Sequence, residues 1–379
     1  MRNPGTRLRV ALVRQRYTPY GGAERFIERA LPALERAGAE VTLIARAVEG
    51  WGARRSLRVD PFYLGNAWRD RSFARAARAA WTAGGFDLVQ SHERIAGCHV
   101  YRAGDGVHAQ WLEIRRESAG ALERLGLALN PYHRYVCGAE RRMFADPALR
   151  AVVCNSAMVR DEIRRRFGVA EDKLHVINNG VDLAHFHPER RAALRAAARE
   201  DLGVKQGETL FLFVGSGFAR KGLDAAIAAL GACGEPAFRL TVAGRDRDAA
   251  QFAASAAGLA GRVQFLGGRD DVRPLYAAAD CFILPTRYDP FPNTVLEALA
   301  MGLPVIVGRR SGAAEIVQPG SGWICDPAGV PALAGMMRDA ARAAALPDTA
   351  AAARGVAERY GIDDMARKLA ALYTRLAAN

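Results

Sequence analysis

The segment Leu210-Phe211-Leu212-Phe213-Val214 is followed directly by Gly215-Ser216-Gly217-Phe218-Ala219-Arg220-Lys221-Gly222. The first five residues form an apolar run of strand length, and the glycine-rich turn leads into residues 223–230, which we expect to be helical. A strand, a glycine-rich turn and a helix in this order begin a parallel α/β unit. This stretch therefore predicts the fold of the second half of the chain.

The same alternation continues on the C-terminal side of this segment. We expect strands at residues 239–243, 263–265, 281–284 and 304–307, and helices at 249–257, 272–278 and 294–301. Alternating strands and amphipathic helices are typical of a parallel sheet with helices on its faces. The second half is therefore predicted to be a Rossmann-like domain, and the Ala-rich segments 330–343 and 363–378 are predicted helices.

The first half of the chain repeats this rhythm. We expect strands at 8–13, 41–45, 87–90, 150–154 and 174–177, and helices at 23–37, 71–83 and 158–167. A polar, turn-rich stretch, 178–188, follows and is typical of a hinge. The sequence thus predicts an α/β protein with two Rossmann-like domains that face each other across a cleft. The first spans residues 1–185, completed by a C-terminal helix at about 361–379, and the second spans 186–360.

Length, charge and cysteine content narrow the class of protein. The chain has 379 residues, a formal net charge of +13 and six scattered cysteines without a Cys-x-x-Cys pair. Two domains fit this length, and scattered cysteines are typical of reduced thiols. No apolar run is long enough to span a bilayer, and residues 8–13 are followed at once by Arg14 and Arg16, unlike a signal peptide. We therefore expect a cytoplasmic protein that binds anions.

The glycine-rich turn carries the first candidate site. Gly215 begins a loop that is expected to expose free backbone amides beside Arg220 and Lys221, and Lys221 is one of only four lysines in the chain. Amides at the start of a helix together with two cations suit a diphosphate. The alternative is a strand-to-helix turn that needs glycine for its geometry alone.

The second candidate site lies in residues 286–298. Here a strand ends, a Pro-rich loop carries Asp289, Asn293 is placed to cap a helix, and Glu297 lies one turn inside that helix. Carboxylates accept hydrogen bonds from sugar and ribose hydroxyls, and the amides of Thr294 and Val295 can meet phosphate. The alternative is a loop acid and an acid that stabilises its own helix N-terminus.

Several ordered motifs resemble glycosyltransferase family 4, and the resemblance covers essentially the whole chain. The motifs lie at residues 177–182, 215–222, 267–272, 276–280, 289–297 and 300–306. Within the family, the likeness is greatest to members that transfer glucose to a heptose of the lipopolysaccharide core, and it includes the loop at residues 20–25. The resemblance implies the GT-B fold and a retaining glycosyltransferase.

The resemblance also implies roles for individual residues on the donor side. Arg220 and Lys221 match the pair that neutralises the donor diphosphate. Asp289 and Glu297 match the two ends of the family's Glu-x7-Glu motif, in which the first acid contacts the sugar and the second the ribose. Asp289 stands where the family usually has Glu, so the identity of the donor sugar is left open. The catalytic set implied is Asp105, Arg220, Lys221 and Asp289, and the donor-binding set is Gly21, Gly22, Gly215, Arg220, Lys221, Asp289, Asn293, Thr294, Val295 and Glu297.

The resemblance also implies roles for residues on the other side of the predicted cleft. Gly21 and Gly22 match a loop that lets the backbone approach the phosphates, and Asp105 matches an acidic position on the acceptor side. His92 lies where many relatives carry a polar residue or His, although a lone His is as easily structural. The implied substrates are a nucleotide sugar, best matched by UDP-glucose, and a lipopolysaccharide inner-core heptose or another phosphoglycan. No cofactor and no metal are implied.

Residues 106–144 mix large apolar side chains with arginines. Trp111, Leu122 and Leu125 are interleaved with Arg115 and Arg116, among others. This composition is typical of an interfacial segment on anionic lipid, and the alternative is a pair of ordinary amphipathic helices over the sheet. We therefore expect a peripheral protein on the inner face of the inner membrane.

Other classes of protein compete with this interpretation. A nucleic-acid-binding protein would explain the charge, but no nucleic-acid-binding motif is present, and we expect no nucleic acid partner. A dehydrogenase would explain the Rossmann pattern, but no Gly-x-Gly-x-x-Gly follows the first strand. Asp246-Arg247-Asp248 resembles a metal-binding Asp-x-Asp, yet Arg220 and Lys221 supply the charge that a cation would. A transferase with a mannosyl, galactosyl or N-acetylhexosaminyl donor, and a non-catalytic nucleotide-sugar binder, both stay open.

Overall fold

The computed structural model describes residues 7–17, 31–32, 34–36, 38–52, 54–259 and 261–378. Their contacts form two compact units. The first contains the chain up to Asn179 together with Ile362–Asn379, and the second is Gly180–Gly361. The turn-rich stretch 178–188 therefore contains the division, and Val181 pairs with Gly361 within the second unit.

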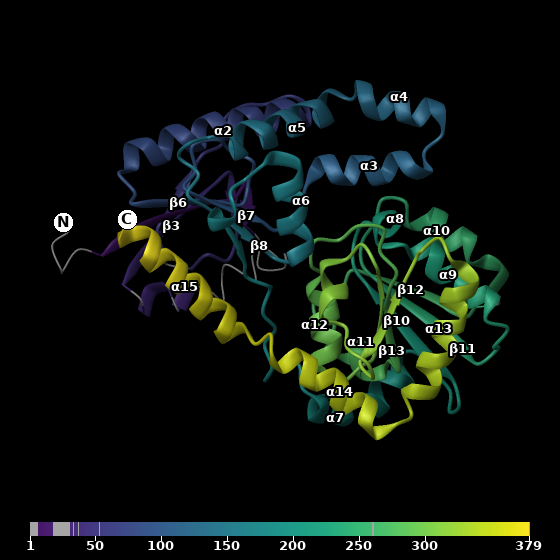
Figure 1. Ribbon diagram of the computed structural model, residues 1–379. Helices are drawn as coiled ribbons and strands as arrows, with labels where there is room; N and C mark the ends of the chain where they lie inside the picture. The colour runs from purple at the N-terminus through teal and green to yellow at the C-terminus, as the bar shows by residue number, and fades with distance from the viewer. Residues whose placement is uncertain are drawn as a thin grey trace. The chain divides into compact units, whose positions relative to one another are not determined.

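The first unit is built on a parallel sheet (Figure 1). Its strand order is β5-β3-β1-β6-β7-β8-β9 among the described residues, and each neighbouring pair is parallel. The strands are β1 (Leu8–Val13), β3 (Ala39–Ala45), β5 (Ser56–Arg58), β6 (Leu88–Ser91), β7 (Val100–Ala103), β8 (Ala151–Cys154) and β9 (Leu174–Val176). Two short strands, β2 (Arg16–Tyr17) and β4 (Ala47–Val48), pair beside it. The order reverses between β1 and β6, where open α/β sheets bind ligands.

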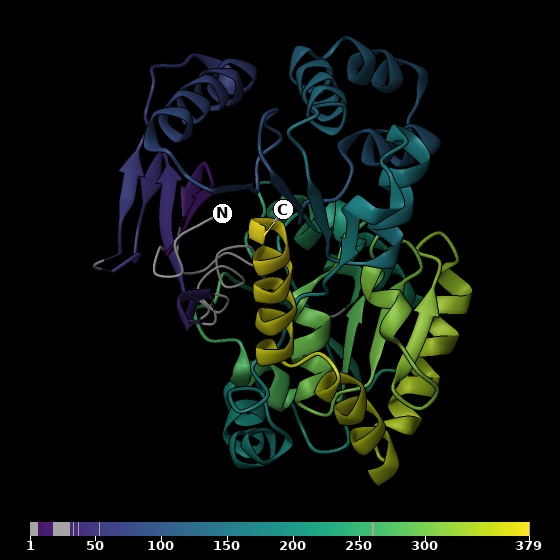
Figure 2. The same cartoon turned by 60° about the vertical axis from the view of Figure 1, so that its left-hand side comes forward.

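Two cores lie on opposite faces of this sheet. Because side chains alternate along a strand, Val10 and Leu12 of β1 belong to one core and Ala11 and Val13 to the other. The C-terminal helix α15 (Ile362–Ala378) buries an apolar stripe in the first core, and in Figures 1 and 2 it runs in yellow beside the strands of this unit. The opposite face is covered by α2 (Gly65–Gly84) and α6 (Ala157–Phe167).

Three helices form an excursion between β7 and β8. They are α3 (His108–Ser118), α4 (Ala121–Leu129) and α5 (Pro131–Phe144). The buried carboxylate of Glu140 accepts hydrogen bonds from His108 N at 2.7 Å and Arg94 Nε at 2.9 Å. One carboxylate thus joins the beginning of α3 to α5.

The second unit has the strand order β12-β11-β10-β13-β14-β15, all parallel. Counted within the unit, this is 3-2-1-4-5-6, the order of dinucleotide-binding folds, with its reversal between β10 and β13. The strands are β10 (Thr209–Val214), β11 (Phe238–Ala243), β12 (Val263–Gly267), β13 (Cys281–Leu284), β14 (Val305–Gly308) and β15 (Gly322–Cys325).

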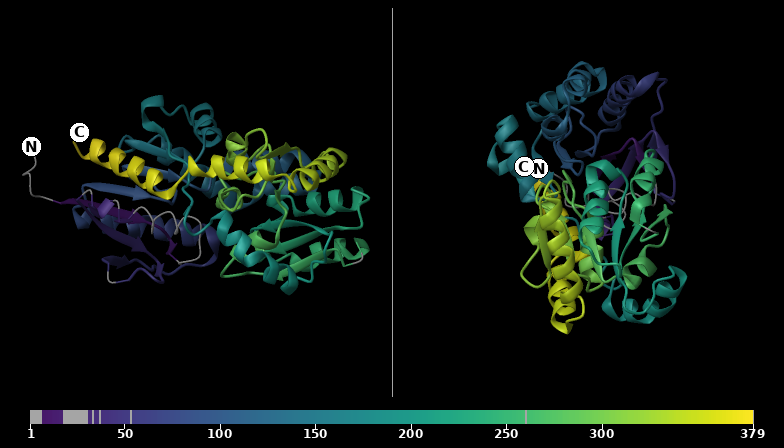
Figure 3. Two further views of the ribbon diagram at one scale, coloured as in Figure 1. Left: turned by 90° about the horizontal axis from the view of Figure 1, so that it is seen from below. Right: turned by 90° about the vertical axis from the view of Figure 1, so that its right-hand side faces the viewer.

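Helices pack on both faces of the second sheet (Figure 3). One layer contains α9 (Leu223–Ala232), α10 (Ala249–Ser255) and α13 (Val330–Ala343), and the other contains α7 (Pro188–Asp201), α11 (Arg273–Ala278), α12 (Asn293–Ala300) and α14 (Pro347–Glu358). The short helices of this unit are α8 (Phe218–Lys221), η2 (Ala257–Leu259) and η3 (Gly312–Ile316), whereas η1 (Glu171–Lys173) belongs to the first unit. Sequence periodicity predicted neither α7 nor α14, because both are rich in Ala and have few large apolar residues to form a clear stripe.

The two-domain α/β fold predicted from the sequence is confirmed, and most predicted elements of the second half agree with the structure to within a few residues. The predicted helix at 23–37 lies largely outside the described residues. No described helix is long and apolar enough to cross a membrane.

Candidate donor and acceptor sites

The candidate donor site lies at the carboxyl ends of β10 and β13, the two strands that flank the reversal in the second sheet. The loop of Gly215–Gly222 follows β10, and the loop that carries Asp289 follows β13. The tertiary structure therefore brings two segments about 70 residues apart to the position where such sheets bind ligands.

Glycine is required at two close contacts between backbone segments around the candidate donor site. Gly222 has φ of +74°, and a Cβ at this position would lie 2.0 Å from the carbonyl oxygen of Pro285. Gly244, after β11, would place a Cβ 2.0 Å from the carbonyl oxygen of Gly215. The backbone segments thus pack at distances that a side chain would prevent.

The loop does not expose its amides as predicted. Gly215 N donates to Ala243 O at 2.9 Å, and Phe218 N donates to Asp246 Oδ2 at 2.7 Å. Arg220 and Lys221 end the short helix α8, and only Gly222 separates Lys221 from the start of α9. For Gly215 and Phe218 the prediction of free amides was wrong, because β11 and Asp246 accept from these donors, and the loop also offers the cations Arg220 and Lys221 to an anion.

Both cations converge on one carboxylate. Lys221 Nζ lies 3.0 Å from Asp289 Oδ2, and Arg220 Nη1 lies 3.1 Å from the same oxygen and donates to Tyr288 O at 2.8 Å. Lys221 is 8% exposed and Asp289 5% exposed. Burial by itself raises the pKa of Asp289, but the charges and hydrogen bonds of Lys221 and Arg220 outweigh it and lower the pKa below its usual value.

The backbone of Asp289 is also fixed. Its N–H donates to Arg310 O at 3.1 Å and its carbonyl accepts from Gly312 N at 2.9 Å, so residue 289 bridges to the segment after β14. Backbone pairing thus fixes residue 289, while Lys221 and Arg220 hold its carboxylate. Such a position is preorganised for binding, because little side-chain freedom remains to be lost.

Glu297 lies in the helix that follows this loop. The residue is 4% exposed, and its Oε2 accepts a hydrogen bond from the hydroxyl of Tyr276 at 3.0 Å. Tyr276, from α11, therefore orients the second acid of the motif. The hydroxyl oxygen of Thr294, in the first turn of the same helix, is buried and has no hydrogen-bond partner, which in a folded protein indicates a position completed by a ligand or water.

The beginning of α12 differs from the prediction. The N-cap residue is Pro292, whose side chain makes no capping hydrogen bond, and Asn293 is the first helical residue. Asn293 as helix cap was therefore wrong, since the proline ring ends the loop one residue earlier. Val295 N donates to Pro292 O at 3.2 Å and is not free for phosphate.

A second pocket lies in the first unit, at the carboxyl ends of β1 and β6. It has a volume of about 310 Å³ and includes Arg14, Glu93, Arg94 and Asp105 in its lining. Arg14 Nη1 lies 3.6 Å from Glu93 Oε1 and 3.9 Å from Asp105 Oδ2. Charged groups of both signs in one pocket can bind hydroxyl groups and an anion together.

Glu93 is a candidate that the sequence analysis missed. It lies two residues after the end of β6, as Asp105 lies two residues after the end of β7, and an acid just past a buried strand was the available signal. Burial raises the pKa of Glu93, although Arg14 and the amide of Gln15 act in the opposite direction. Gln15 N donates to Glu93 Oε1 at 3.0 Å, so the carboxylate is tied to the end of β1.

His92 is buried in the first unit and lies beside Gln90. Its Nε2 is 3.0 Å from Gln90 Nε2, and Gln90 Oε1 accepts a hydrogen bond from the hydroxyl of Tyr373 in α15. Burial, reinforced by Arg14 and Arg102, lowers the pKa of His92 well below its usual value. His92 is therefore neutral at physiological pH and packs beside Gln90, the residue of β6 that is hydrogen-bonded to the C-terminal helix.

Two predicted positions, Gly21 and Gly22, lie outside the described residues. The Asp246-Arg247-Asp248 triplet serves a loop: Asp246 Oδ1 accepts from Asp248 N at 2.9 Å while Oδ2 accepts from Phe218 N. Within the described ranges, no group of three or more His, Cys, Asp or Glu side chains could hold a metal ion.

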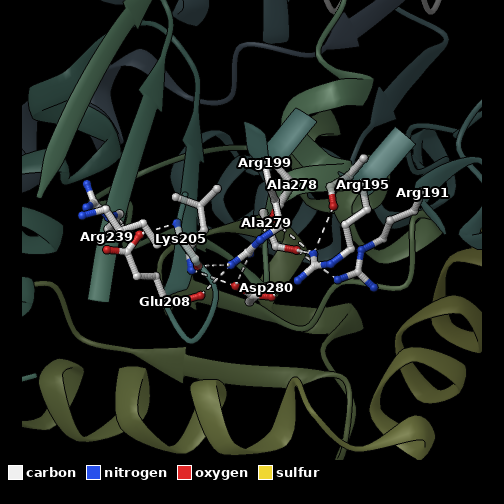
Figure 4. A network of polar contacts seen from close by, with 11 residues as sticks. Arg191, Arg195, Arg199, Lys205, Glu208, Arg239, Ala278, Ala279 and Asp280 are labelled. Carbon is white, nitrogen blue, oxygen red and sulfur yellow. Dashed lines mark hydrogen bonds and ion pairs between the residues drawn. The ribbon is translucent and has the colours of Figure 1, made fainter. Parts of the chain in front are cut away.

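Asp280 belongs to one of the motifs, but it lies at the amino end of β13, opposite the candidate donor site at the carboxyl ends of the strands (Figure 4). Its carboxylate accepts from Arg195, from Arg199 Nη1 at 3.0 Å and from Leu210 N at 2.8 Å. Arg191 Nη2 donates to Ala279 O at 2.9 Å. The arginines of α7 thus bind the carbonyls after α11, and this part of the motif maintains the fold.

Comparison with known families gives two adjoining matches. Residues 20–185 match the model described as Glycosyltransferase Family 4, and residues 195–349 match Glycosyl transferases group 1. The two models meet near the division between the compact units.

Individual relatives match over most of their length. A probable transglycosylase of Burkholderia thailandensis is 29% identical over 85% of this chain and 83% of its own. The lipopolysaccharide glucosyltransferase WaaG of Escherichia coli is 26% identical over 81% and 82%. A crystal structure of WaaG has a TM-score of 0.82 at 24% identity and covers 96% of this chain and 99% of its own. Anabaena HepE in complex with UDP-glucose has a TM-score of 0.71 at 21% identity over 97% and 100%.

Proposed function

Since the chain belongs to the glycosyltransferases of group 1 and family 4, with the GT-B fold, we propose that it transfers glucose from UDP-glucose to a heptose of the lipopolysaccharide core or to a similar membrane-associated glycan. The observation that carries the donor half of this proposal is the convergence of Lys221 and Arg220 on Asp289 at the sheet reversal. The similarity to WaaG, a lipopolysaccharide glucosyltransferase, supports the choice of sugar and acceptor.

In this proposal the donor diphosphate binds at the two cations. Arg220 contacts two phosphate oxygens with its planar guanidinium, and Lys221 adds a compact charge at the leaving phosphate. The Asp289 carboxylate then accepts hydrogen bonds from hydroxyl groups of the sugar, and the Glu297 carboxylate, which is held by Tyr276, accepts hydrogen bonds from those of the ribose. Because these two cations supply the charge, the reaction needs no divalent metal and no cofactor.

Transfer proceeds with retention of the anomeric configuration. The bond between the anomeric carbon and the phosphate oxygen breaks, the acceptor oxygen bonds to that carbon on the same face, and the acceptor proton passes to the leaving phosphate. Catalysis is then mainly positioning and stabilisation of the diphosphate charge. The acceptor glycan binds in the pocket of Arg14, Glu93 and Asp105 in the first unit.

The acceptor's location implies contact with a membrane. On α4, the side chains of Leu122, Leu125 and Leu129 are 87%, 56% and 63% exposed. Arg115, Arg116 and Arg124 lie on the same excursion. Exposed leucines among arginines suit an anionic bilayer surface, and we propose that the protein is peripheral on the inner face of the inner membrane.

The donor is tested by thermal shift against a panel of UDP and GDP sugars, followed by analysis of the product formed with lipopolysaccharide core acceptors. A donor at 100 times its dissociation constant stabilises the protein by about 2.7 kcal/mol. Stabilisation by UDP-glucose, with UDP release that depends on acceptor, is expected. A preference for another sugar nucleotide would exclude glucose transfer, and binding without any UDP release would indicate a non-catalytic protein.

The membrane contact is tested by vesicle flotation. Leu122→Asp and Leu125→Asp are expected to reduce binding to anionic vesicles about tenfold each, since each removes a leucine that would be buried in the interface. Arg→Ser changes at Arg115, Arg116, Arg141 and Arg142 should reduce binding further. If binding in the flotation assay depends neither on the anionic lipid content nor on these substitutions, the proposed membrane contact is wrong.

A further inference from the structure

The exposed apolar side chains of the first unit gather in a second place, away from α4. Of eleven large apolar side chains exposed in the described part of the chain, five lie in residues 57–68: Leu57, Phe62, Tyr63, Leu64 and Trp68. Phe62 is 73% exposed, Leu64 67% and Trp68 48%. We call residues 57–68 the aromatic patch. Exposed apolar surface concentrated in this way marks a binding site.

The aromatic patch is held in place from beneath. The buried guanidinium of Arg46 donates to Asp60 Oδ1 at 2.7 Å, to Pro61 O at 2.8 Å and to Arg69 O at 3.1 Å. It also lies 4.6 Å from the centre of the Tyr63 ring. The patch is therefore preformed, and its apolar groups stay exposed because the backbone beneath them is fixed.

A groove of about 800 Å³ lies beside the patch, between α2 and α5. Its lining is Pro61, Ala67, Trp68, Arg71, Ser72, Arg75, Ala76 and Tyr135. Most of these side chains are apolar or aromatic, and Trp68 also packs edge-on against Phe62 at 5.8 Å between ring centres. The volume suits one ligand with a long apolar part.

The groove carries positive charge that the protein leaves unpaired. Arg71 and Arg75 lie one helical turn apart on α2, and in the described ranges neither has a carboxylate within ion-pair distance. In contrast, the neighbouring Arg69 is paired with Asp70 at 2.9 Å. An apolar groove with two free guanidinium groups is complementary to an anionic amphiphile.

We propose that the groove between α2 and α5 binds one acyl chain of an anionic phospholipid, with the lipid phosphate at Arg71 and Arg75. A free phosphate ion would bind the two arginines but make no use of Trp68 and the apolar lining. An uncharged ligand with an acyl chain would fill the apolar lining but make no use of the two arginines. Aromatic side chains and arginine together are the groups that proteins place at the lipid headgroup level. This inference does not rest on the donor chemistry, and it concerns a surface separate from α4.

The test uses the full chain and dihexanoylphosphatidylglycerol below its micelle concentration, with binding followed by calorimetry and by the change in intrinsic tryptophan fluorescence. Saturable one-to-one binding is expected, weakened about tenfold or more by the Arg71→Ser, Arg75→Ser double variant, since each arginine contributes about 1 kcal/mol. Ala76→Leu fills the groove and should also weaken binding. Arg78→Ser, on the same helix but outside the lining, is the matched control and should bind as wild type.

Several results would overturn the inference. Equal affinity for dihexanoylphosphatidylcholine would show that the groove does not recognise the charge of the lipid. Displacement of the lipid by sodium phosphate alone would show that the acyl chain does not contribute to binding. Unchanged binding by the double variant, or binding seen with vesicles but never with the monomeric lipid, would also overturn the inference. UDP-glucose binding is measured on the same variants and should be unchanged, so a failure here is distinguishable from a failure of the proposed function.

Discussion

Lys221 Nζ lies 3.0 Å from Asp289 Oδ2, although 68 positions separate the two residues in the chain. Both groups are buried, and Arg220 contacts the same oxygen. A diphosphate that binds here must compete with Asp289 for the two cations. Substitutions of the residues in these ion pairs therefore test the proposed donor site.

Lys221→Ala is expected to lower turnover by about 100-fold or more, because the charge that develops on the leaving phosphate loses its nearest cation. The variant should fold, since Arg220 still contacts Asp289. Acceptor-dependent UDP release measures the effect, and Lys205→Ala, an exposed lysine of the same unit, is the control. Near wild-type kinetics in a folded Lys221→Ala protein would refute the role.

Asp289→Asn is expected to lower the free energy of unfolding by about 3 kcal/mol at pH 7, because it leaves a buried lysine without its carboxylate. Since the folded-state pKa of Asp289 lies below its usual value of 3.8, the wild-type advantage is complete above about pH 4 and declines as the pH falls through the lowered pKa. Urea unfolding of both proteins between pH 7 and pH 3 checks this. A difference that grows toward low pH would contradict it.

Glu297→Ala is expected to raise the KM for the donor by roughly 10- to 100-fold, because a charge-assisted hydrogen bond to the nucleotide is lost. Tyr276→Phe removes the hydroxyl that lies 3.0 Å from Glu297 Oε2 and should have a smaller effect in the same direction. Steady-state kinetics at varied UDP-glucose measures both. A fall in kcat with KM unchanged would assign Glu297 a different role.

Gly222→Ala is expected to destabilise the protein by about 2 kcal/mol or more, since a methyl group would meet Pro285 O and the residue is left-handed. Gly126→Ala is the matched control. Gly126 lies in α4 with open space around it, so alanine should stabilise the helix by about 0.5–1 kcal/mol. Thermal unfolding of the two variants should give shifts of opposite sign.

Chelation of divalent metals is expected to leave activity unchanged. Both oxygens of Asp246 already accept backbone N–H groups, from Phe218 and Asp248, so this aspartate stabilises the loop that carries Arg220 and Lys221. The measurement is UDP release with and without EDTA. Loss of activity that manganese restores would overturn the metal-free mechanism.

The sequence by itself determined the fold class and the two segments of the donor site. Alternating apolar runs and helical periodicity depend on local spacing, and Gly215–Gly222 and Asp289–Glu297 stand out as ordered motifs. It did not predict α7 or the strand β7, since α7 lacks a clear apolar stripe and Arg102 interrupts the short apolar run of β7.

Only the tertiary structure decided which groups meet. The strand order 3-2-1-4-5-6 places β10 beside β13, and this neighbourhood, which local sequence does not encode, brings Lys221 to Asp289. The same long-range packing takes the Gly215 and Phe218 amides that the motif appeared to leave free, and it puts Glu93 beside Arg14 in the first unit. Periodicity reports the face that each element buries, whereas contacts between distant segments depend on how the whole sheet is assembled.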